Sequence, residues 1–239
     1  MQPGVNGLIY KTLDGGTNWQ KLVPDGGVLA HDIYAMYFSA SDSGFAVGHR
    51  GRILKTANGG SSWQEYAATY TDMKDLHFVT NAVGYAATAS DLIKTTDAGK
   101  SWSRLGLTLP DQDDFFRNIY FYKDTGLAIA DAPVQLYKTY DGGKNWRTVQ
   151  ISNMFYNAFL GAFFTGNTGY LTTSGSPNQV YKTSDAGETW TLQSSDFNKF
   201  YSNLQFTDEK TGYGTVGPFI YKTQVSGRSW YYTPQGTRQ

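Results

Sequence analysis

Short apolar runs alternate with polar, glycine-rich turns along the whole chain. The run that starts at Ile9 enters a turn closed by Trp19, and the chain repeats this pattern five more times. Short runs bounded by Gly, Asp, Asn and Ser are typical of β-strands joined by tight turns. The later copies are Ile53 to Trp63, Leu92 to Trp102, Leu136 to Trp146, Val180 to Trp190 and Ile220 to Trp230.

The spacing of the copies predicts a repeat architecture. Every tryptophan of the chain closes one copy, and successive tryptophans are 44, 39, 44, 44 and 40 residues apart. This spacing is close to the length of one four-stranded blade of a β-propeller. Aromatic residues make up 16% of the chain and charged residues only 17%, which also favours strands over helices. We therefore predict an all-β propeller.

Each copy follows the pattern Ser/Thr-x-Asp-x-Gly-x-x-Trp, here called the Asp box. The aspartate can accept hydrogen bonds from its own turn, and glycine permits the positive φ of a tight hairpin. The tryptophan is expected to point back into the blade and to be buried there. In the sixth copy Val225 replaces the acid, which predicts the weakest turn. The structural box acids are Asp14, Asn58 (an amide in place of the acid), Asp97, Asp141 and Asp185.

Two further strands precede each of the later boxes. The first ends at an aromatic residue such as Phe38 or Phe78, and the second begins at a glycine such as Gly44 or Gly84. We expect a single domain over residues 1–239, with five full blades and an N-terminal hairpin. Either the chain is a segment of a longer protein or its ring closes imperfectly, and we favour the segment. The expected repeats are 1–22 (partial), 30–66, 72–105, 117–149, 157–193 and 200–233.

Charge and cysteine content exclude several kinds of function. The 20 basic and 20 acidic residues balance, so no net charge attracts nucleic acid. No stretch approaches the roughly 20 apolar residues of a membrane span, and the first residues carry no signal-peptide pattern. The absence of cysteine rules out disulfides and thiolate metal sites. We expect no cofactor.

No pattern of metal ligands is present either. The acidic loop from Asp111 to Arg117 fails as a calcium loop, because Phe116 stands where glycine is needed and Tyr122 where glutamate is needed. The three histidines are spread over two blades and do not form a cluster of zinc ligands. The sequence therefore predicts no metal site.

The long loops of a rigid scaffold are where binding residues usually lie. In propellers these loops emerge on the face opposite the Asp boxes. Polar pairs that precede the first strand of each blade are expected to converge there, although a simple solvated rim is the alternative. Aromatic loop tips on the same face are expected to anchor a partner, unless they pack onto the blades below. The candidate binding residues are His31, Asp32, Lys74, Asp75, Phe115, Phe116, Arg117, Asn118, Phe155, Tyr156 and Asn157.

The boxes resemble the Asp-box, or BNR, repeats of sialidases, sortilin-type receptors, xyloglucanases and photosystem II stability/assembly factor-like proteins. The regular spacing, the Gly-Tyr-Ala-like strand and the Tyr-Lys-Thr lead-in are most similar to the last group. This resemblance covers nearly the whole chain. It implies a non-enzymatic scaffold that binds a protein partner, and an extracytoplasmic (secreted or periplasmic) location.

Two alternatives to this interpretation are a glycan-binding module and a fragment of a glycoside hydrolase propeller. A sialidase needs three converging arginines and a tyrosine braced by glutamate. The chain has seven arginines, of which only Arg50, Arg52 and Arg117 fall on the loop face. A xyloglucanase-like enzyme needs two carboxylates across a cleft between two propellers. The sequence therefore favours a scaffold over an enzyme.

Overall fold

The computed structural model describes most of the chain. The described residues are 2–3, 9–14, 18, 20–22, 32–66, 71–109, 115–131, 134–151, 158–174, 177–196, 203–206, 208–216 and 219–232. The chain divides into two compact units, Met1–Lys123 and Asp124–Gln239, which are described separately below. The expectation of one domain over the whole chain stays a prediction.

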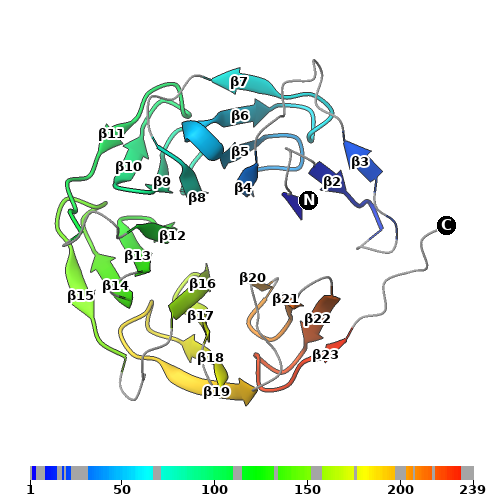
Figure 1. Cartoon of the computed structure of the whole chain (residues 1–239), viewed down its shortest axis with the longest axis vertical. Coiled ribbons are helices and arrows are strands. Elements are labelled where there is room, and N and C mark those ends of the chain that lie inside the picture. Colours follow the sequence, from blue (N-terminus) through cyan, green and yellow to red (C-terminus); the bar gives the residue numbers. More distant parts are fainter. Residues whose placement is uncertain are drawn as a thin grey trace. The chain divides into compact units, whose positions relative to one another are not determined.

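The first unit contains a small N-terminal sheet and the sheets that follow it (Figure 1). The predicted N-terminal hairpin is formed by β2 and β3, and a two-residue strand, β1, pairs with β2 as a third member. The strands of this unit are β1 (Gln2–Pro3), β2 (Ile9–Lys11), β3 (Gln20–Leu22), β4 (Ile33–Phe38), β5 (Gly44–Gly48), β6 (Ile53–Thr56), β7 (Gln64–Tyr66), β8 (Met73–Phe78), β9 (Gly84–Thr88), β10 (Leu92–Thr95), β11 (Ser103–Arg104) and β12 (Phe116–Tyr122).

The second unit continues the same pattern of antiparallel strands. Its strands are β13 (Thr125–Asp131), β14 (Val134–Thr139), β15 (Arg147–Val149), β16 (Ala158–Thr165), β17 (Thr168–Ser174), β18 (Asn178–Thr183), β19 (Thr191–Asp196), β20 (Asn203–Phe206), β21 (Gly212–Val216), β22 (Phe219–Thr223) and β23 (Tyr231–Tyr232). Four consecutive strands make each of the five blades, β4–β7, β8–β11, β12–β15, β16–β19 and β20–β23. Within the described residues, the one helical element is a 3-10 turn, η2 (His49–Gly51). The predicted all-β fold with five four-stranded blades is confirmed.

The glycine that opens the second strand of a blade makes room for an aromatic ring. In the sheet β8–β11, a Cβ atom on Gly84 would lie 2.5 Å from the ring of Phe78. The indole of Trp102 meets this ring edge-on, with centroids 6.2 Å apart. A larger residue at position 84 would therefore displace the ring that the box tryptophan covers. The same arrangement joins Phe38, Gly44 and Trp63, and Phe206, Gly212 and Trp230.

Neighbouring blades are joined by stacked aromatic rings. Tyr85 of β9 stacks on Phe121 of β12 with 3.4 Å between ring centroids. In the second unit Tyr170 of β17 stacks on Phe206 of β20 at 3.5 Å. All four side chains are at most 2% exposed. Because each ring is buried by the next blade, the core of a unit continues from blade to blade.

The box tryptophans are less buried than expected. Trp230 is 9% exposed, whereas Trp63, Trp102, Trp146 and Trp190 are half-buried. The indole N–H groups of Trp102, Trp146 and Trp230 each donate to a carbonyl of their own box turn. One edge of the indole therefore lies at the turn, at the end of the blade. Trp19 lies outside the described residues.

The box turns are held by a threonine as much as by the acid. In the fourth box, the Thr139 hydroxyl donates to Asp141 Oδ1 over 2.8 Å and accepts from the Gly143 amide over 3.1 Å. The backbone and side chain of Asn145 donate to the two oxygens of Asp141 over 2.9 and 2.7 Å. These hydrogen bonds from Asn145 and Thr139 hold the pKa of Asp141 well below its usual range.

The same hydrogen bonds recur in the other boxes, with one exception. They lower the pKa of Asp97 to about 2 through Ser101 and Thr95. In the sixth box the Gly227 amide still donates to Thr223 over 3.1 Å, but Val225 offers no oxygen. The turn therefore has only half of the usual side-chain support, and its lower stability stays a prediction. The threonine hydroxyl also makes the corresponding bonds at Asp14, Asn58 and Asp185.

Candidate functional site

A cluster of polar side chains surrounds Asp72 in the first unit, at the start of β8. Asp72 Oδ1 accepts a hydrogen bond from the backbone amide of Arg50 over 2.9 Å and lies 3.0 Å from His49 Nδ1. Asp72 Oδ2 lies 3.1 Å from the Lys74 ammonium and accepts from the Tyr34 hydroxyl over 3.3 Å. One carboxylate therefore connects the strand β4, the turn η2 and the strand β8.

The electrostatics of this cluster follow from the contacts of Asp72. Partial burial alone would raise the pKa of Asp72, but the hydrogen bond from the Arg50 amide and the nearby charge of Lys74 outweigh burial and lower it. The pKa of Tyr34 is raised, first by burial and then by the charge of Asp72. The Lys74 ammonium also lies 4.5 Å from the centroid of the Tyr34 ring. At neutral pH Asp72 is ionised and Tyr34 is neutral.

The backbone at Arg50 is unusual for an arginine. Its φ of 58° and ψ of 32° lie in the left-handed region, and Gly51 follows with a φ of 68°. On one side the His49 amide donates to the Asp32 carbonyl over 3.0 Å, and on the other the Arg50 amide is held by Asp72. A Cβ on Gly48 would collide with the Asp32 carbonyl, so the turn needs glycine there. The result is an exposed arginine on a fixed, strained turn.

The structure corrects one alignment made from the sequence. Asp32 and Asp72 each stand six residues before the phenylalanine that ends their strand, so Asp72 is the equivalent of Asp32. The pair of Lys74 and Asp75 lies inside β8, three residues later than the pair of His31 and Asp32 in its own blade. These two pairs therefore do not occupy the same place. Counting back from the strand-ending phenylalanine would have identified Asp72, which the sequence reasoning missed.

Asp75 points into the protein and not to a rim. Its Oδ2 accepts hydrogen bonds from the Ile119 amide over 3.0 Å and from Asn118 Nδ2 over 3.2 Å, and its Oδ1 accepts from the Leu76 amide over 2.9 Å. Burial raises the pKa of Asp75 to about 6, although these hydrogen bonds act in the opposite direction. Two of the candidate residues, Asp75 and Asn118, are thus brought together, as a brace between β8 and β12.

The aromatic side chains expected at exposed loop tips are more buried than predicted. Phe116 is completely buried, because it opens the strand β12 and its ring belongs to the core. The expectation that Phe116 is exposed is therefore wrong, and the alternative, packing onto the blade, holds for it. Phe115 is half-buried, with the Arg117 guanidinium 5.6 Å from its ring centroid. The candidates His31, Phe155, Tyr156 and Asn157 lie outside the described residues.

His77 is not a ligand. Its ring packs between Tyr37 and Tyr120, with centroids 5.2 and 4.5 Å away. Burial lowers the pKa of His77 to about 4, so the ring is neutral at physiological pH. Over the described ranges, no three His, Asp or Glu side chains are grouped so that they could hold a metal ion. None of the helices among those residues has the length and apolar character of a membrane span.

The repeated sheets with their box turns define the chain as an Asp-box β-propeller protein. The sequence model of one family, described as Photosynthesis system II assembly factor YCF48, matches residues 60–236. The chain belongs to this family. A search of curated proteins by sequence finds no match.

Solved structures with similar folds include YCF48 proteins and GH74 enzymes. A structure titled "YCF48 bound to D1 peptide" is 18% identical, with 84% of this chain and 82% of that chain covered and a TM-score of 0.51. YCF48 from Cyanidioschyzon merolae is 17% identical, covers 84% of each chain and has a TM-score of 0.58. The GH74 enzyme of Niastella koreensis is 17% identical, with 84% of this chain but 38% of that chain covered and a TM-score of 0.69. At these identities the likeness shows the fold alone.

Proposed function

We propose that this chain is a non-enzymatic scaffold that binds a protein partner, and that the cluster around Asp72 is part of the contact surface. Family membership supports the first part, and so does the relative that was solved with a bound D1 peptide. The extracytoplasmic location implied by the resemblance belongs to the same proposal.

The observation that carries the proposed site is the conformation of Arg50. A left-handed residue other than glycine costs about 1 kcal/mol or more, and strained backbone of this kind clusters at active sites and ligand-binding sites. Ala98, Ala186 and Ser226 share this conformation within box turns, whereas Arg50 lies outside any box. Here an exposed arginine keeps this conformation because Asp72 holds its amide and the Asp32 carbonyl holds the preceding residue. Arginine is also among the residues that dominate the binding energy of protein interfaces. We therefore assign Arg50 the role of an anchor.

A substitution at Arg50 can separate binding from folding. Glycine adopts the φ of 58° without strain, so Arg50→Gly should leave the free energy of unfolding within about 1 kcal/mol of the parent. The same change should weaken binding about tenfold or more, because it removes the anchor. Binding would be followed by fluorescence anisotropy with a labelled D1 peptide, the ligand of the relative.

The matched control is Arg104→Ala. Arg104 lies on β11 of the same unit, its side chain is 65% exposed, and its guanidinium is 3.4 Å from Asp91. This change should leave peptide binding unaltered. If Arg50→Gly binds the peptide as the parent does, or if Arg104→Ala loses the same affinity, Arg50 is not the anchor.

A second candidate function, cleavage of a β-glucan, follows from the GH74 match. That enzyme aligns with most of this chain at a TM-score of 0.69. Against this function, the two carboxylate oxygens of the partly buried Asp75 accept hydrogen bonds from β12 and from its own strand. Incubation of the purified chain with xyloglucan should release no sugar. Turnover that disappears in Asp75→Asn or Asp32→Asn would instead establish a hydrolase.

A further inference from the structure

The lysine that precedes each box threonine usually lies over an aromatic ring of its own blade. Lys182 lies 5.5 Å from the centroid of Tyr170, its cross-strand partner, and Lys94 lies 5.0 Å from Tyr85. The same pairing joins Lys55 with Phe45 and Lys222 with Tyr213. In β13 the corresponding residue is Leu127, which pairs with Lys138 of β14. The cross-strand partner is therefore not a ring in this blade, and the Lys138 ammonium lies 5.0 Å from the ring centroid of Tyr140 in its own box turn.

Lys138 also extends into the box turn of the next blade. Its ammonium donates to the Ala186 carbonyl over 2.8 Å and to Glu188 Oε1 over 2.6 Å, and its side chain is 1% exposed. Leu127 packs against the same turn, since a Cβ on Gly187 would lie 2.6 Å from its Cδ1 atom. A buried ammonium needs such partners, because an unpaired buried charge is very costly.

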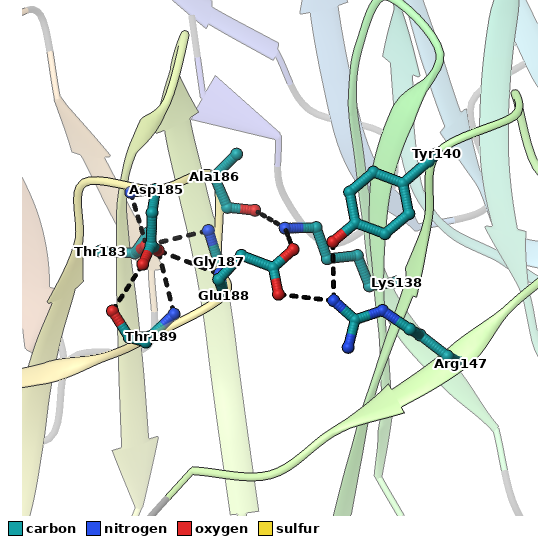
Figure 2. A network of polar contacts seen from close by, with 9 residues as sticks. All are labelled: Lys138, Tyr140, Arg147, Thr183, Asp185, Ala186, Gly187, Glu188 and Thr189. Carbon is teal, nitrogen blue, oxygen red and sulfur yellow. Dashed lines mark hydrogen bonds and ion pairs between the residues drawn. The ribbon is translucent and has the colours of Figure 1, made fainter.

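The other oxygen of Glu188 closes the connection. Glu188 Oε2 accepts a hydrogen bond from Arg147 Nη2, which also donates to the Tyr140 hydroxyl over 2.7 Å. Figure 2 shows Glu188 between the Lys138 ammonium and the Arg147 guanidinium, with the hydrogen bonds of Asp185 on the other side of the turn. Lys138 belongs to β14 and Arg147 to β15, so one carboxylate of the fifth box holds two strands of the preceding blade.

We propose that Lys138, Glu188 and Arg147 form a latch that makes the strands β13–β15 and the fifth box turn open as one cooperative segment. Lys182 lies over Tyr170, and among the described residues it makes no hydrogen bond or ion pair to the sixth box turn. Local opening of a protein proceeds in contiguous units whose bounds depend on such contacts. The latch therefore extends the segment that opens together, so that it includes the fifth box turn of the next blade.

Amide hydrogen exchange of the whole chain tests the latch. The amides of Ala186, Gly187 and Thr189 are all hydrogen-bonded, to Asn167, Thr183 and Asp185, so their exchange reports opening of the fifth box. Lys138→Met should accelerate them about tenfold or more, since a hydrogen bond to a charged group is lost. The control Lys182→Met should leave the Ser226 and Gly227 amides of the sixth box unchanged.

A second variant keeps the test decisive if Lys138→Met does not fold. Glu188 is 35% exposed, and in Glu188→Gln the charge is removed while the amide oxygen can still accept a hydrogen bond from the Lys138 ammonium. This variant should also accelerate exchange in the fifth box, by a smaller factor. The latch is refuted if neither variant accelerates these amides, or if Lys182→Met accelerates the sixth box as much as Lys138→Met accelerates the fifth.

Discussion

Asp75 and His77 lie two residues apart on β8, and they should act on stability in opposite directions as the pH changes. Both are titratable groups that burial keeps from ionising, with pKa values of about 6 and about 4. One is an acid and the other a base, so the neutral forms are favoured on opposite sides of the pH scale. The prediction is that their contributions to the free energy of unfolding cancel between about pH 4 and 6.5.

The contribution of His77 rises with pH. The unfolded chain takes up a proton on this ring below about pH 6.5, whereas the folded chain does so only below about pH 4. Between these values the unfolded state binds more protons, so the free energy of unfolding increases as the pH rises. At about 1.4 kcal/mol for each pH unit, the gain is about 3 kcal/mol.

The contribution of Asp75 falls with pH. The folded chain keeps this proton up to about pH 6, whereas the unfolded chain loses it near pH 3.8. In this range the folded state binds more protons, so the free energy of unfolding decreases as the pH rises, by about 3 kcal/mol. The box carboxylates do not interfere, because the lowered pKa values of Asp97 and Asp185, both about 2, place their effect below about pH 4.

Urea titrations at several pH values between 4 and 6.5 measure these contributions. In the parent chain the free energy of unfolding should change little over this range. In Asp75→Asn only the contribution of His77 to this pH dependence remains. The free energy of unfolding of this variant should therefore rise by about 3 kcal/mol from pH 4 to pH 6.5. His77→Phe, which keeps a ring between Tyr37 and Tyr120, should show the reverse slope.

The slopes of the free energy of unfolding against pH in the two variants test the protonation states of Asp75 and His77. If Asp75→Asn follows the pH dependence of the parent, the carboxyl of Asp75 does not keep its proton in the folded chain. If His77→Phe shows the same pH dependence of unfolding as the parent, the imidazole of His77 is not kept neutral in the folded chain. Opposite slopes in the two variants, with a flat parent, would establish both assignments at once.

Two further predictions concern the turns and the blades. Val225→Asp should supply the missing acid of the sixth box, because Thr223 is already in place, and raise the free energy of unfolding by about 1 kcal/mol relative to Val225→Ala. A urea midpoint no higher than that of the alanine variant would contradict the role of the acid. Gly84→Ala should cost about 1 to 3 kcal/mol, because its Cβ would lie 2.5 Å from the Phe78 ring. Gly106→Ala is the control, since no atom lies within 4 Å of its Cβ and only its backbone conformation is disfavoured.

The fold could be predicted from the sequence because its signals are local. In the fourth box the Asp141 hydrogen bonds reach only two residues back, to Thr139, and four residues on, to Asn145. A pattern of eight residues therefore contains the whole turn and the hydrogen bonds that stabilise it. The residue that the pattern understated was the threonine, whose hydroxyl bonds both the acid and the glycine amide. The pattern includes a Ser or Thr at this position, but it does not indicate which groups the hydroxyl bonds.

The site could not be read in the same way, because its contacts join residues far apart in the chain. Asp72 is 22 residues from Arg50 and 38 from Tyr34, and no short motif includes them together. The prediction of exposed loop tips rests on residue type alone, and Phe116, which is completely buried, contradicts it. Aromatic side chains beside a strand are more often part of the core than of the surface, and Phe116 is the first residue of β12.

The contacts between blades nevertheless share a feature that a sequence does contain. Asp75 bonds to Ile119, 44 residues on, and Lys138 to Glu188, 50 residues on. Lys11 bonds to the Gly59 carbonyl across 48 residues. These separations are close to the repeat length, because each blade packs on the next and equivalent positions face each other with a small offset. In a repeat protein polar partners are therefore expected about one period apart, and a position that breaks the repeat, such as Leu127, marks where the contacts between blades differ.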